Sequence, residues 1–150
     1  MIGRAFSFNQ NYNEQTSAVI CLSYILCKKY SEYLKELSDL KPEINGLYLM
    51  DIYRQLRNNN KRFTFSFPID NVNDAVVGAN GHSMYMIRLY HDGKPHYVVY
   101  HYGQLYDPLK NNSEQKSINE LRELVEKSIS TNGGLNDFDD KVFWCIRIIE

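Results

Sequence analysis

The chain has 150 residues, of which 43% are hydrophobic and 23% charged, and its formal net charge is −1. These values predict one globular domain that spans residues 1–150. The near-zero charge gives no basic surface for a nucleic acid, and no apolar run is long enough to cross a bilayer, so neither partner is expected. The N-terminus lacks the apolar stretch of a signal peptide, which predicts a cytoplasmic protein or export by a signal-peptide-independent route.

The three cysteines, Cys21, Cys27 and Cys145, favour reduced thiols. Their number is odd, and two of them lie in an apolar helical pattern, which is not typical of a disulfide framework. No pair of cysteine or histidine residues has the spacing of a zinc site, so we expect neither a metal nor another cofactor.

The N-terminal half has helical periodicity. Apolar residues recur at intervals of three and four over residues 17–37, which predicts a core helix whose first half is buried. Pro42 marks the loop after it, and a shorter helix is expected over 46–56, ended by three asparagines at 58–60.

The rest of the chain is dominated by strand patterns, with a polar loop at 68–80. A hairpin turn with Asp-Gly at its centre, residues 91–94, separates the two densest of them. Strands are expected at 62–67, 83–90, 96–102, 104–108 and 141–149, and an amphipathic helix at 117–130. Together these elements predict an α+β fold, in which an N-terminal core helix packs on an antiparallel β-sheet.

Ser17 lies at the start of the first predicted helix. A nucleophile at this position gains from the positive end of the helix dipole and from nearby backbone N–H groups, which could form part of an oxyanion hole. The simpler interpretation is that Thr16 or Ser17 is only the N-cap of the helix.

Two histidines begin predicted strands and are candidate general bases, His82 and His96. Asp107 ends the strand that follows His96, and the start of one antiparallel strand lies near the end of the next. The carboxylate could then fix the tautomer of the His96 imidazole. His91, in the predicted turn, and His101, at a strand end, show no such arrangement.

The segments "NQNYNEQTSAVICLSYIL" and "HYVVYHYGQLYDP" together resemble papain-like cysteine peptidases of the bacteriocin-processing, double-glycine type. That family has a cysteine that opens a helix, often with a second cysteine four residues on and a leucine after it. Ser17, Cys21 and Leu22 fit this spacing, and His96 and Asp107 fall where the family has its histidine strand and its Asp-Pro. The resemblance implies a papain-like fold.

The segment "NGHSMYM" resembles instead the papain-fold glutamine deamidases and toxin domains of bacterial effectors, whose site often begins with Gly-His on a strand. This resemblance would make His82 the base. The spacing to Asp107 favours His96.

These resemblances imply a thiol hydrolase that acts on a protein or peptide substrate, either as a peptidase or as a glutamine deamidase. A cysteine at position 17 would attack an amide carbonyl, His96 would move the proton and Asp107 would orient His96. Gln10, or less suitably Gln15, would donate to the oxyanion together with the backbone N–H of residue 17. The size of the chain favours a free-standing effector or toxin.

The departure from the family is Ser17 itself, since a serine hydroxyl is a poor nucleophile beside a papain-type histidine and the chain is expected to be inactive or impaired as written. Three explanations are open: an engineered Cys-to-Ser change, which we favour, a natural pseudoenzyme, or catalysis by Cys21, which its apolar neighbours disfavour. Two other functions remain: a catalytically dead papain-fold module that binds a protein, and a structural domain without a site.

Overall fold

The computed structural model of the chain describes residues 16–64, 67–68, 84–91, 94–101, 104–108, 123 and 144–149. The helices within these ranges come first in the chain: α1 (Ser17–Leu26), α2 (Tyr30–Glu36), the 3-10 helix η2 (Ser38–Leu40), α3 (Pro42–Asn45) and α4 (Leu49–Asn58). The strands follow: β1 (Arg62–Phe63), β2 (Phe67–Pro68), β3 (Met84–His91), β4 (Lys94–His101), β5 (Gln104–Tyr106) and β6 (Trp144–Ile149).

The strands form one antiparallel sheet in the order β1-β6-β3-β4-β5, with β2 also paired to β6. Strands β3, β4 and β5 form a meander of consecutive neighbours. The last strand, β6, instead lies between β1 and β3, so the C-terminal strand of the described residues is inside the sheet. The predicted α+β class with an antiparallel sheet is confirmed.

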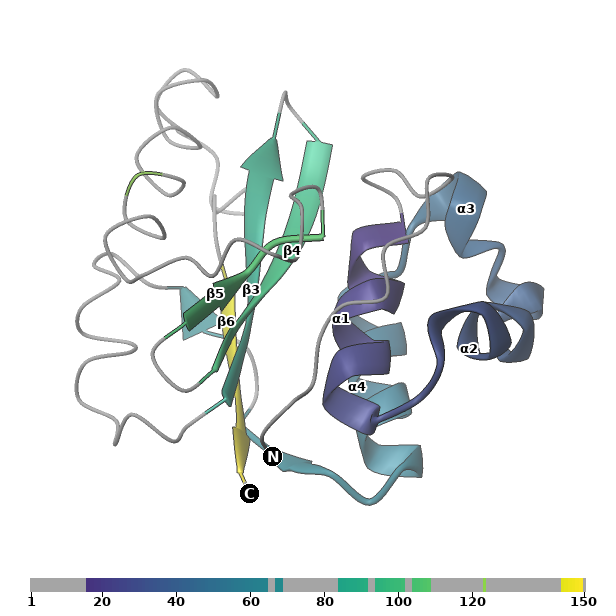
Figure 1. Ribbon diagram of the computed structural model, residues 1–150, viewed down its shortest axis with the longest axis horizontal. Coiled ribbons are helices and arrows are strands. Elements are labelled where there is room, and N and C mark those ends of the chain that lie inside the picture. Colours follow the sequence, from purple (N-terminus) through teal and green to yellow (C-terminus); the bar gives the residue numbers. More distant parts are fainter. Residues whose placement is uncertain are drawn as a thin grey trace.

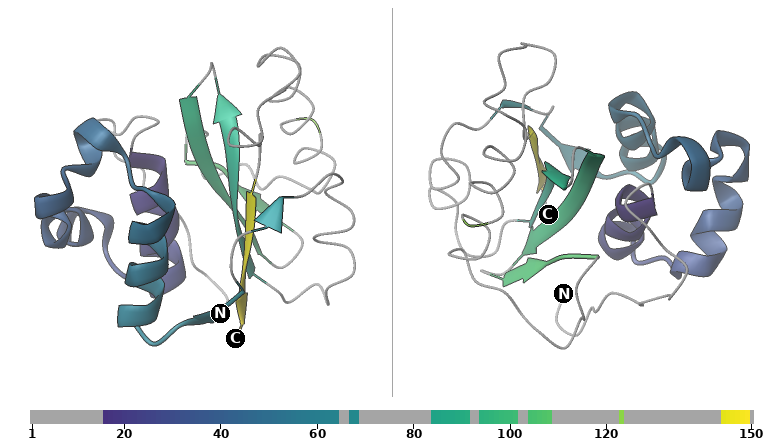
Figure 2. Two further views of the ribbon diagram at one scale, coloured as in Figure 1. Left: turned by 180° about the vertical axis from the view of Figure 1, so that it is seen from behind. Right: turned by 90° about the horizontal axis from the view of Figure 1, so that it is seen from above.

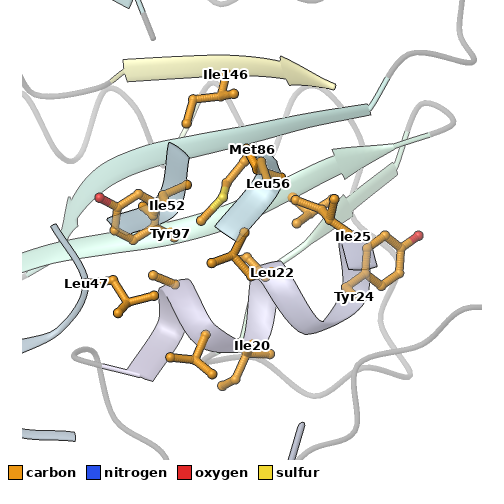
Figure 3. Close-up of a cluster of buried hydrophobic side chains, with 14 of the residues drawn as sticks. Ile20, Leu22, Tyr24, Ile25, Leu47, Ile52, Leu56, Met86, Tyr97 and Ile146 are labelled. Atoms are coloured by element: carbon orange, nitrogen blue, oxygen red, sulfur yellow. The ribbon is translucent and has the colours of Figure 1, made fainter. Parts of the chain in front are cut away.

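The helices lie together on one side of the sheet, with α1 nearest to the strands (Figures 1 and 2). Helix α1 packs against β4, and α2 and α4 pack against α1. The core fills the space between α1, α4 and the sheet (Figure 3), and its members include Leu22, Ile25, Ile52, Leu56, Met86, Tyr97 and Ile146. Every residue of α1 from Ser17 to Ile25 is buried, so the prediction of a buried core helix is confirmed for its first half.

The prediction of one helix over residues 17–37 is wrong, because α1 ends at Leu26 and α2 begins at Tyr30. Cys27 adopts the left-handed conformation with φ 58°, and the N–H of Lys28 donates to the carbonyl of Ser23 at 2.9 Å. This is the Schellman arrangement, which usually has glycine at the left-handed position. Because a cysteine occupies it here, the sequence carries no signal for the break.

The second predicted helix, residues 46–56, is also displaced in the structure. Pro42 begins the short helix α3 rather than marking a loop, since its fixed φ suits the first helical turn. Gly46, with φ 67°, separates α3 from α4. The N–H of Tyr48 then donates to the carboxylate of Asp51 at 3.0 Å, which is one half of a capping box at the start of α4.

The strand predictions are confirmed where the residues are described, with shifts of a few residues at the ends. The exception is residues 62–67, where two short strands, β1 and β2, pair with β6 in place of one continuous strand. The predicted helix at 117–130 lies outside the described residues apart from position 123. None of the helices in the described part of the chain is long and apolar enough to cross a membrane.

Two buried thiols should make the fold less stable at high pH. Burial raises the pKa of Cys145 to about 12 and the pKa of Cys21 well above that of an ordinary thiol. The unfolded chain therefore loses these protons from about pH 9 upward while the folded chain keeps them, so the stability is complete below pH 9 and declines above it. Between pH 8 and 9.5 each thiol should lower the free energy of unfolding by about 1 kcal/mol.

Urea denaturation under reducing conditions at these two pH values tests this prediction, with Cys145→Ala as the comparison. The variant should be less stable at both pH values, because a buried side chain is shortened, but it should lose less stability between them. An equal loss in both proteins would show that the Cys145 thiol does not contribute.

Candidate active site

Ser17 occupies the first position of α1 and is fully buried, with 0% of its surface exposed. Its hydroxyl oxygen accepts a hydrogen bond from the backbone N–H of Tyr97 in β4 at 3.0 Å. The start of the helix is thus bound directly to the first half of β4, 80 residues away in sequence. The N-terminus of α1 therefore contacts β4 inside the protein.

The N–H of Tyr97 is available to Ser17 because β5 has ended. The last pair between β4 and β5 is Val99 with Tyr106. Continuing this register would place Pro108 opposite Tyr97, and a proline has no N–H for the ladder. Ser17 takes the place in the hydrogen-bonding pattern that a longer β5 would fill.

The prediction that Thr16 or Ser17 is the N-cap of α1 is confirmed for its position but not for a side-chain hydrogen bond. Thr16 is the residue at the N-cap position, yet its side chain makes no capping hydrogen bond. It is hydrogen-bonded to the Tyr30 hydroxyl, which opposes the rise that burial causes in the pKa of Tyr30. The Ser17 hydroxyl, which lies one position further on, turns to the sheet.

His96 and Asp107 form a buried pair beside this contact. The imidazole Nε2 of His96 and the carboxylate Oδ1 of Asp107 are 2.7 Å apart, and the residues are 2% and 6% exposed. His96 lies near the start of β4, and Asp107 directly follows β5. The structure thus brings together the histidine and the carboxylate that the spacing of 11 residues places at neighbouring strand ends.

The contact with Asp107 determines how the His96 ring can act. An ionised carboxylate only accepts hydrogen bonds, so Nε2 must carry the proton in this pair. In a neutral imidazole the lone pair is then on Nδ1, and Nδ1 is the atom that could accept a proton from a nucleophile. The carboxylate thereby fixes both the tautomer and the plane of the ring.

Ser17 and His96 are neighbours through the backbone of β4. The Ser17 oxygen lies 3.0 Å from the N atom of Tyr97, and only two covalent bonds separate that atom from the Cα atom of His96. The Ser17 oxygen is therefore within about 6 Å of the His96 Cα atom. The start of α1 and the start of β4, which carries His96, therefore form one buried corner of the protein.

Cys21 lies in the same helix but differs chemically from position 17. It is completely buried, and burial, followed by the negative charge of Asp107, raises the pKa of its thiol well above the ordinary value. A thiol that stays protonated is a weak nucleophile. Cys27 is exposed at the opposite end of α1 from position 17. Neither feature favours these cysteines as the reacting group.

The other candidates lie outside this corner or outside the described residues. Gln10, Gln15 and His82 belong to the residues that the structure does not describe. His101 ends β4, is 1% exposed, and has its Nδ1 2.9 Å from the hydroxyl of Tyr24 in α1. The position of His101 at a strand end gives no sign of this pair, and no residue type reveals the contribution of the Tyr97 backbone.

Among the described residues, no group of three or more histidine, cysteine, aspartate or glutamate side chains could hold a metal ion. No protein-family model matches the sequence. A search of curated proteins finds no significant match either.

We predict that Nε2 of His96 carries a proton at pH 7.5, because Asp107 can only accept there. Nitrogen NMR of the labelled protein, with long-range coupling to the ring protons, distinguishes the two ring nitrogens. In Asp107→Ala the preference for Nε2 should weaken, while the signals of His91 in β3 serve as the internal comparison. A proton on Nδ1 alone would contradict the assignment.

Proposed function

We propose that the chain has a papain-like fold whose nucleophile position is residue 17, and that a cysteine at this position makes it a thiol hydrolase. The observation that carries this proposal is the buried arrangement of the α1 N-terminus, His96 and Asp107 at the end of β5. The order of these elements along the chain is the one that the resemblance to papain-like peptidases implies.

The proposed reaction is acyl transfer from an amide. Nδ1 of His96 takes the proton of the position-17 thiol, and the thiolate attacks the carbonyl carbon while the π electrons move to the carbonyl oxygen. When this intermediate collapses, the C–N bond breaks and His96 returns the proton to the leaving nitrogen. Water then cleaves the thioester in the same way, which gives a carboxylic acid and regenerates the thiol.

The helix supplies stabilisation at two stages of this reaction. The positive end of the α1 dipole favours a thiolate at its first position. The N–H of residue 17 belongs to the first turn, where helices have no internal acceptor for the N–H groups, and it is the proposed donor to the oxyanion. The N–H of Tyr97, which meets the Ser17 oxygen at 3.0 Å, would stabilise a thiolate in the same place.

With Ser17 the same groups give little catalysis, because a hydroxyl has a much higher pKa than a thiol and gains less from the dipole. The proposed substrate is a protein, cut at a peptide bond or deamidated at a glutamine side chain, since both reactions pass through the same thioester. As a free-standing domain the chain is proposed to act as an effector or toxin rather than in export.

Ser17→Cys tests the proposal. The new thiol should react with iodoacetamide at pH 6 about 100-fold faster than an ordinary exposed thiol, because its pKa is lowered by 2 or more units. Peptide mass spectrometry reads the labelling at each cysteine, so Cys27, which is exposed, is the reference within the same molecule.

The control variants are Ser17→Cys combined with His96→Ala, with His82→Ala or with His91→Ala. Fast labelling should disappear with His96→Ala and persist with His91→Ala, which removes a histidine of no proposed role. Loss with His82→Ala instead would move the base to that residue. The catalytic proposal fails if the new thiol never reacts faster than Cys27.

The alternative is a papain-fold module that binds a protein without catalysis. One observation favours it: Ser17 is fully buried and its oxygen is already engaged by the N–H of Tyr97, which suits a structural hydroxyl. In that case Ser17→Cys should lower the free energy of unfolding, since sulfur is a weaker acceptor than oxygen, and the new thiol should react no faster than Cys27.

A further inference from the structure

A second polar contact joins α1 to β4 at the opposite end of the helix. The hydroxyl of Tyr24 and Nδ1 of His101 are 2.9 Å apart in a buried hydrogen bond. The two rings also meet edge to face, with centroids 5.9 Å apart and an interplanar angle of 81°. Two buried polar side chains are thus held in one geometry by both a hydrogen bond and a ring contact.

Tyr24 contacts β5 as well as β4. Its ring lies 5.1 Å from the ring of Tyr106, centroid to centroid, at an interplanar angle of 33°. Tyr106 is the last residue of β5 and directly precedes Asp107. One side chain of α1 therefore touches both strands that carry the candidate base and its carboxylate.

The two polar contacts are aligned on the helix and on the strand. Ser17 and Tyr24 are seven residues apart, which is two helical turns, so they share one face of α1 about 10 Å apart. Tyr97 and His101 are four residues apart, so they share one face of β4 about 13 Å apart. Helix α1 and strand β4 run alongside each other (Figure 1), and a polar contact joins them at each end.

The apolar packing between these two contacts determines the position of the helix less closely than the hydrogen bonds do. Leu22, Ile25, Met86 and their neighbours form an apolar cluster in which Tyr24 lies at one end and Tyr97 at the other (Figure 3). Apolar contacts depend on buried area and have no preferred direction, whereas a hydrogen bond weakens steeply when its atoms move by less than 1 Å.

We propose that Tyr24 and His101 are positioning residues, which set where α1 lies along β4 and so hold position 17 against the N–H of Tyr97. The pair does not touch the reacting atoms and acts through the helix. Its effect on the structure is independent of any reaction, while its consequence for catalysis rests on the proposed function.

The first test uses the protein with Ser17 and does not depend on any catalytic activity. Hydrogen exchange by NMR measures how strongly the Tyr97 amide is protected, relative to the amide of Ile52 in α4. In Tyr24→Phe the Tyr97 protection should fall by about 5–10-fold, which is the effect of one weakened hydrogen bond. Global destabilisation would lower both amides together and is thereby distinguished.

Tyr33→Phe is the matched control. Tyr33 is also a fully buried tyrosine of the helical layer, but its hydroxyl donates to Gln55 of α4 at 2.8 Å and not to the sheet. The Tyr33→Phe variant loses a comparable hydrogen bond, but that bond does not join α1 to β4. The relative protection of Tyr97 should therefore stay within about 2-fold of the parent protein.

His101 variants test the same contact from the strand. His101→Asn keeps an acceptor near the place of Nδ1 and should preserve most of the protection of the Tyr97 amide, while His101→Leu should lose it. If His101→Leu does not fold, Tyr24→Phe still decides, because it removes only a hydroxyl. Unchanged relative protection of Tyr97 in Tyr24→Phe would overturn the proposal.

The second test adds Tyr24→Phe to Ser17→Cys and follows the pH profile of iodoacetamide labelling. The apparent pKa of the new thiol should rise, with labelling at pH 6 slowed about 10-fold relative to Ser17→Cys alone. The two proposals can fail separately. If the new thiol of Ser17→Cys is labelled no faster than Cys27, but Tyr24→Phe still lowers the protection of the Tyr97 amide, the proposed function fails and the positioning role stands.

Discussion

The contact on which the rest of the site depends is the hydrogen bond from the Tyr97 N–H to the Ser17 oxygen. It exists because β5 stops before Pro108, so that one backbone group of β4 has no strand partner on that side. The start of α1 fills this place. The same interruption puts Asp107, the residue after β5, next to His96. The end of β5 before Pro108 therefore leaves room for a helix end and places the Asp107 carboxylate beside His96.

The burial of this corner increases what each polar group does there. In a medium of low dielectric constant, the helix dipole, the carboxylate and a backbone N–H act more strongly on a neighbouring charge than they would in water. Burial has the opposite effect on Cys21. Together with the charge of Asp107 it raises the pKa of this thiol, which stays protonated. Position 17 and position 21 are one helical turn apart. In the proposed reaction the helix dipole and the Tyr97 N–H would favour a thiolate at position 17, whereas burial disfavours a thiolate at position 21.

Much of the α+β architecture could be predicted because it depends on local patterns. The pairing of β3 with β4 follows from alternating apolar residues on either side of an Asp-Gly pair. The burial of α1 follows from a run that is apolar all round. The helix boundaries could not be predicted where a non-glycine residue takes the left-handed conformation, as Cys27 does, because the usual marker of a helix end is then absent.

For the site, the sequence by itself determined the pairing of His96 with Asp107, since a single tight hairpin separates them and antiparallel geometry places them together. It also placed Ser17 at the beginning of a buried helix. Only the tertiary structure decided that the hydroxyl of Ser17 turns to the sheet instead of capping its helix, and that Tyr24 reaches His101. Both contacts join residues about 80 positions apart, and their geometry depends on how a helix lies along a strand, which no local pattern encodes.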